Sequence, residues 1–230
     1  MPELPPILLA GLTGLISGLL LSIPVGPINL TIVNEGARRG FKWAALIGLG
    51  ATVMEVIYCF IAFTGFASFC TQGHMKPVMQ LFGFGFMSFI GIKFLLARSV
   101  PARPVRLGAV VTDRIEARLE ERLHPHSAFM TGLVRVMGNV GVLVFWVFLA
   151  LYFTSHGLVT PDWTGKLACV AGVAVGTGAW FAGLSWAVSL GHGKFSEKAL
   201  LRMEHYSGAF LLALALAQGA IIIWQMHKGH

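Results

Sequence analysis

The sequence predicts an all-α integral membrane protein with six transmembrane helices, arranged as two inverted-topology three-helix repeats. Three observations predict it: an apolar composition, six long apolar runs, and an uneven distribution of basic residues between those runs. Of the 230 residues, 56% are hydrophobic and only 12% are charged, and the mean hydropathy is +0.75. A soluble domain carries about 25% charged residues, so this chain has too few charges to cover a soluble surface.

Six apolar runs are long enough to cross a bilayer, which takes about 20 helical residues. Residues 1–6 lack the basic start of a secretory signal, so the first run is expected to be a retained span. The chain is expected to be one transmembrane domain over residues 1–230, with repeats at about 7–97 and 128–226. The expected spans are 7–33, 43–66, 77–97, 128–153, 167–190 and 206–225.

Basic residues are concentrated in every second connection. Loops 1, 3 and 5 contain twelve Lys and Arg residues, whereas loops 2 and 4 and the two ends contain three. The positive-inside rule then places loops 1, 3 and 5 in the cytoplasm of a multi-pass cell-membrane protein, with both termini outside. Loop 3, at about 98–127, contains a segment at 113–123 that is expected to form an amphipathic helix on the cytoplasmic face. Whether this helix regulates or only connects is left open.

The first span contains an unusual break, Pro24-Val-Gly-Pro-Ile-Asn29. Each proline removes a backbone donor, and Gly26 adds conformational freedom. Unpaired backbone groups in hydrocarbon cost several kcal/mol, so a broken span needs cover from protein or from a water-filled cavity. Transporters use such breaks as binding sites, although a packing kink is the alternative.

The two halves resemble each other. Residues 138–141 (Gly-Asn-Val-Gly) stand in the fourth span where the break stands in the first, and spans 2 and 5 both contain closely spaced glycines. With three spans in each half, the second copy must cross the membrane in the opposite sense. Matching broken elements in inverted repeats indicate a transporter site at the repeat interface. The alternative is that the two halves resemble each other by chance, because apolar segments are similar in composition.

The ordered set of motifs resembles the lysine exporter (LysE/RhtB) family of amino-acid exporters over nearly the whole chain. The motifs are the Pro-Val-Gly-Pro of residues 24–27, the glycines at 40, 48, 50, 83 and 91, Glu55, Asn139, and the Ser-Gly at 207–208. The sequence departs from the family pattern at Val25, Ile28 and Val140, and its acid is Glu55 instead of the commoner Asp. The resemblance implies export of amino acids or related small metabolites, usually in exchange for protons.

Glu55 is the only acid inside an expected span. It lies about 18 Å from the cytoplasmic end of span 2 by helical rise, near the membrane centre. A charge there costs at least about 2.5 kcal/mol, so Glu55 is expected to face the bundle interior and to bind and release the coupling proton. The alternative is a structural ion pair with Arg135.

Five residues are candidates for binding the substrate. Arg135, in span 4, has a planar fork that suits a substrate carboxylate, although it could also pair with Glu55 or reach the interface. The side-chain amides of Asn29 and Asn139 are expected to bind the substrate from symmetry-related spans, and helix–helix hydrogen bonding is the alternative. The candidates are Gly26, Pro27, Asn29, Arg135 and Asn139.

Other function classes find less support in the sequence. A thiol-redox carrier would use Cys59 and Cys169, and a cation or metal permease would need more than the one intramembrane acid. No ATPase or hydrolase motif is present, so the chain is not expected to be an enzyme or to use a cofactor or metal. The expected partners are a small-molecule substrate, protons and lipid, with no nucleic acid; a homodimer is left open.

Overall fold

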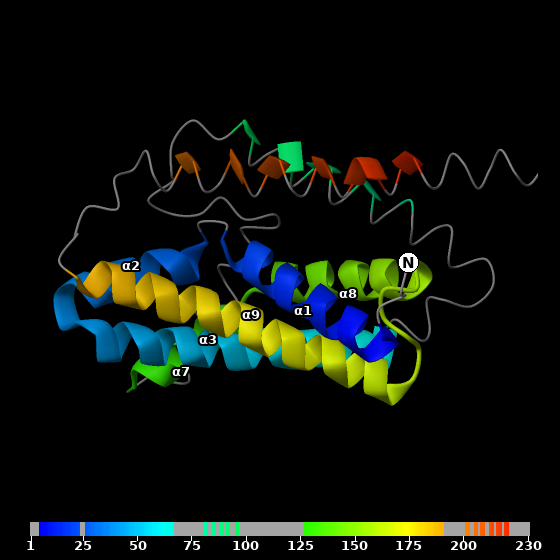
Figure 1. Cartoon of the computed structure of the whole chain (residues 1–230). Coiled ribbons are helices and arrows are strands. Elements are labelled where there is room, and N and C mark those ends of the chain that lie inside the picture. Colours follow the sequence, from blue (N-terminus) through cyan, green and yellow to red (C-terminus); the bar gives the residue numbers. More distant parts are fainter. Residues whose placement is uncertain are drawn as a thin grey trace, which may run out of the picture.

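The computed structural model describes residues 5–23, 26–66 and 127–190, and single positions between 81 and 96 and between 201 and 220. All elements of these residues are helices, and no strand occurs among them. Loop 3, with its expected amphipathic helix, and most of the expected third and sixth spans lie outside the described residues. Figure 1 shows the helices of the described ranges running roughly along one another.

The expected first span is two helices, α1 (Pro6–Ser22) and α2 (Pro27–Arg39). The expected second span is α3 (Phe41–Ile61), which ends in a short π-helical segment, η1 (Ala62–Phe66). The expected fourth span is also two helices, α7 (Ala128–Met137) and α8 (Val140–Ser155), and the fifth is α9 (Trp163–Ser189). Both breaks therefore occur where the sequence predicts them.

Two helices are long and apolar enough to cross a membrane by themselves, at 41–65 and 163–189, within the part of the chain that the structure describes. Helices α7 and α8 are together long and apolar enough for a third span, which would be a broken one, since the two helices bend by 66° at the break. The structure thus supports a helical membrane protein. The six-span inverted repeat stays a prediction.

Side-chain caps mark the starts of α7 and α9. The Ser127 side chain accepts a hydrogen bond from Met130 N–H at the start of α7. The Asp162 carboxylate accepts from Thr164 and Gly165 N–H at the start of α9. Hydrogen bonds from Thr160, from Thr164 and from the Gly165 backbone hold the pKa of Asp162 well below its ordinary value. This cap therefore stays ionised at physiological pH and complements the positive helix end.

Glycine faces bring the helices into close contact. A Cβ at Gly14 would overlap the Cys169 backbone of α9, and a Cβ at Gly172 would overlap the Gly11 carbonyl of α1. Gly18 and Gly176 continue the same contact one turn on. The small-xxx-small spacing of Gly14 with Gly18 and of Gly172 with Gly176 predicts close-packing faces, and the structure places both faces in the contact between α1 and α9. Lipid supplies no hydrophobic drive between helices, so such close backbone packing is a main source of their association.

A second glycine contact joins α3 to α7. A Cβ at Gly50 would overlap the Phe129 carbonyl, and a Cβ at Gly132 would overlap the Ile47 carbonyl. Helices α3 and α9 also pack against each other (Figure 1). Helix α1 is thus held against α9, and α7 against α3.

Replacing Gly172 by alanine is expected to destabilise the protein by about 1–3 kcal/mol, because the new methyl group forces α1 away from α9. Gly183 on the same helix has open space where its Cβ would lie, so Gly183→Ala is the matched control. Thermal unfolding of the purified protein in detergent measures both variants. An unchanged unfolding temperature for Gly172→Ala would contradict the close α1–α9 contact.

Candidate functional site

The two breaks face the middle of the bundle with half-helix ends. Helix α2 begins at the first break, after its N-cap Gly26, and α8 begins at the second, after its N-cap Asn139. Neither N-terminus has a side-chain cap, in contrast to α7 and α9. An uncapped helix N-terminus carries a partial positive charge and free N–H groups, which suit an anionic group.

Asn29 closes the first break. It is only 2% exposed, and its Nδ2 donates to the Ser22 carbonyl oxygen at 2.8 Å, across the break. Trp180 of α9 donates through Nε1 to Asn29 Oδ1 at 3.2 Å. In this conformation Asn29 therefore makes helix–helix hydrogen bonds, the alternative to substrate binding. These bonds connect α1 and α2 to each other and to α9.

Tyr58 closes the second break in the same way. Its hydroxyl donates to the Met137 carbonyl oxygen at 2.6 Å, at the end of α7. The sequence analysis did not single out Tyr58. The signal was available, since Tyr58 follows Glu55 by three residues on α3 and so shares its helix face.

Glu55 is hydrogen bonded to a tryptophan from the second half of the chain. Its Oε2 accepts a hydrogen bond from Trp146 Nε1 on α8 at 2.5 Å. Trp146 is 1% exposed, and Glu55 itself is half-buried. Glu55 lies about 21 Å along α3 from its first residue, at 1.5 Å per residue. The role of Trp146 was not predicted, because nothing in the sequence indicates which face of α8 meets α3.

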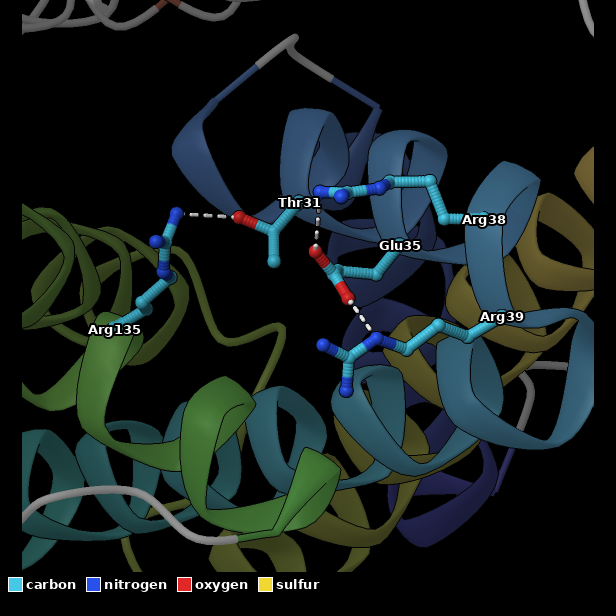
Figure 2. A network of polar contacts seen from close by, with 5 residues as sticks. All are labelled: Thr31, Glu35, Arg38, Arg39 and Arg135. Atoms are coloured by element: carbon cyan, nitrogen blue, oxygen red, sulfur yellow. Dashed lines mark hydrogen bonds and ion pairs between the residues drawn. The ribbon is translucent and has the colours of Figure 1, made fainter.

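Arg135 reaches across from α7 to α2. Its Nη1 donates to Thr31 Oγ1 at 2.5 Å, and Thr31 is buried (Figure 2). Between residues that the structure describes, the ion pairs are those of Glu35 with Arg38 and Arg39, so Glu55 and Arg135 do not form one. The suggested Glu55–Arg135 pair is therefore absent from this conformation. The Arg135–Thr31 bond instead joins the helices that flank the two breaks.

The remaining predicted residues lie at the breaks themselves. Gly26 has an extended backbone, with φ −91° and ψ 177°, and precedes Pro27, the first residue of α2. Asn139 is half-buried, and its backbone N–H donates to the Val136 carbonyl at 2.9 Å. Pro24 and Val25 lie outside the described residues. Every candidate binding residue is thus on one of the two breaks or within one helical turn of it.

The cysteines of the alternative redox function lie on neighbouring helices. Cys59 on α3 and Cys169 on α9 are free and fully buried, on two helices that pack against each other. Thiol–disulfide exchange needs access for a partner thiol, which neither buried side chain offers here. The described residues contain no group of three or more side chains that could hold a metal ion.

Known proteins similar to this chain are transporters. A family model described as "LysE type translocator" matches residues 19–218. The "Putative amino acid efflux protein YcgF" of Bacillus subtilis (strain 168) is 24% identical over 210 residues, which are 90% of this chain and 94% of that protein. No solved structure matches the chain. Since the family model covers most of the sequence, and apolar broken helices form the structure, the chain belongs to the LysE-type translocators.

Proposed function

We propose that this membrane protein is a secondary transporter that exports amino acids or related small metabolites from the cytoplasm in exchange for protons. The observation that carries the proposal is the pair of broken spans, joined by the Arg135–Thr31 hydrogen bond and adjoining the intramembrane acid Glu55. The family and the efflux relative support amino-acid export, and the proton coupling rests on Glu55.

An inverted repeat accounts for the packing. If α1, α2 and α3 correspond to α7, α8 and α9, the α1–α9 contact corresponds to the α7–α3 contact. Both contacts are made by glycines whose Cβ atoms would overlap the facing backbone. The α3–α9 contact then lies on the pseudo-two-fold axis, where it maps onto itself. The two breaks would lie on either side of this axis, where transporters of this architecture bind substrate.

The substrate site that we propose uses both ends of the breaks. The uncapped N-termini of α2 and α8 and the Arg135 guanidinium would bind the substrate carboxylate. Backbone carbonyls at the ends of α1 and α7, with the Asn29 and Asn139 amides and the Gly26–Pro27 backbone, would bind the ammonium group. Binding would displace Arg135 from Thr31 and so loosen the α2–α7 contact.

The coupling step that we propose acts through Trp146. A charged carboxylate accepts a hydrogen bond that is roughly twice as strong as one to a neutral group, so protonation of Glu55 would weaken its bond to Trp146. Trp146 lies on α8, beyond the 66° bend. Proton binding would therefore release α8 from α3, while Tyr58 keeps the end of α7 in place.

Glu55→Gln is expected to abolish proton-driven export, because it keeps the shape and the hydrogen-bond acceptor but cannot titrate. Substrate exchange should continue, since it needs no net proton release. Export and exchange are measured in proteoliposomes with and without an imposed proton gradient. Glu35→Gln, which removes an acid near the cytoplasmic end of α2, is the control and should keep the gradient dependence. Gradient-driven export by Glu55→Gln at the parent rate would make Glu55 a structural residue.

Arg135→Lys keeps the charge but loses the two-pronged geometry. The half-saturating substrate concentration should rise about tenfold, the effect of about 1.4 kcal/mol of lost binding. Concentration-dependent exchange in proteoliposomes measures it. Arg39→Lys, at the exposed end of α2, is the matched control and should change the value little. A half-saturating concentration unchanged in Arg135→Lys would remove Arg135 from the site.

The proposed topology has position 118 in the cytoplasm and position 166 outside. In intact cells a membrane-impermeant thiol reagent should label a cysteine introduced at 166 and not one at 118. Permeabilised cells, in which both positions should react, provide the control for reactivity. Labelling of position 118 from outside would reverse the assignment.

A further inference from the structure

We infer that the substrate is an amino acid without net positive charge, neutral or acidic, and that diamino acids such as lysine are excluded. The inference rests on the proposed function and identifies the charge class of its substrate. It follows from the acids available along the path between the cytoplasm and the breaks, and from what each of them already binds.

The membrane interior offers one carboxylate. Of the ten acidic residues in the sequence, only Glu55 lies within an apolar run. Its carboxylate is engaged by the Trp146 N–H of α8, in the contact between the two halves. One substrate ammonium can be held by neutral carbonyls at the ends of α1 and α7. A second ammonium could pair only with Glu55, which the proposed cycle reserves for the coupling proton. Without a counter-ion, its charge in the interior costs at least about 2.5 kcal/mol.

The cytoplasmic end of α2 also disfavours a cation. Its only acid, Glu35, contacts Arg39 at 3.0 Å and Arg38 at 4.0 Å (Figure 2). Arg39 is held further by the Trp43 ring, 4.6 Å from the guanidinium carbon. The Glu35 carboxylate is therefore already neutralised before a substrate arrives.

The charge balance at this entrance is positive. Figure 2 shows two guanidinium groups, those of Arg38 and Arg39, around the one carboxylate of Glu35 at this end of α2. A surface of one sign attracts the opposite charge and repels its own. The exposed fractions of Arg38 and Arg39, 78% and 53%, mean that solvent and salt screen this field. The positive entrance thus favours amino acids without net positive charge by a small factor. The lack of a counter-ion in the interior provides the larger discrimination against diamino acids.

Two sets of amino acids that differ in side-chain charge at nearly constant length test the inference. The short set is 2-aminobutyrate, 2,4-diaminobutyrate and aspartate; the long set is norleucine, lysine and 2-aminoadipate. Each is offered in exchange for preloaded substrate in proteoliposomes containing the full-length protein at pH 7. In each set from which any member is exchanged, the neutral or acidic member should exchange at least tenfold faster than the diamino member. A diamino acid that exchanges within threefold of its neutral counterpart would overturn the inference and leave amino-acid export intact. If no amino acid moves at all, the proposed function fails and the inference fails with it.

A charge variant tests the contribution of the entrance. Arg38→Gln removes one exposed positive charge and should raise the ratio of lysine to norleucine exchange about threefold at low salt, an effect that screening reduces at high salt. Lys166→Gln makes the same charge change at the opposite end of the bundle and should leave the ratio unchanged. Equal ratios in the parent and both variants would show that the entrance charge does not select substrate.

Discussion

Every backbone polar group within a bilayer must find a partner, and this requirement organises the described structure. Two of the spans expected from the sequence are each divided into two helices, and each break leaves carbonyls at the end of a helix. Asn29 satisfies Ser22 at the first break, and Tyr58 satisfies Met137 at the second. Both contacts also tie the broken span to a continuous one, either directly or through Trp180. The continuous helices α3 and α9 thus support the interrupted ones.

Close glycine packing makes this support possible. A side chain longer than a methyl group at Gly172 or Gly132 would separate the backbones by more than a short polar side chain can bridge. The hydroxyl of Tyr58 on α3 reaches the Met137 carbonyl at the end of α7 at 2.6 Å, across the glycine contact that brings these two helices together. Packing and backbone satisfaction therefore depend on each other, as expected where lipid provides no hydrophobic drive.

The two charged groups of the interior are each held by a neutral partner from the other half of the chain. Glu55 on α3 accepts from Trp146 on α8, and Arg135 on α7 donates to Thr31 on α2. The neutral Trp146 N–H is released by a proton on Glu55 more easily than an ion-pair partner would be, because no second buried charge is left behind. In the proposed cycle, each ligand breaks one of these two bonds and so acts on a different half-helix.

Sequence alone determined the membrane class, the places of both breaks, the glycine faces and the candidate residues around the breaks. Each of these depends on local chemistry: hydropathy over a span length, proline and glycine within a helix, and periodic small residues. The partners were decided only by the tertiary structure. The facing side chains of Asn29–Trp180, Glu55–Trp146 and Arg135–Thr31 are 151, 91 and 104 residues apart. The pattern of α8, apolar all around, gave no sign that Trp146 meets Glu55, because periodicity predicts which face is small or polar but not which helix covers it.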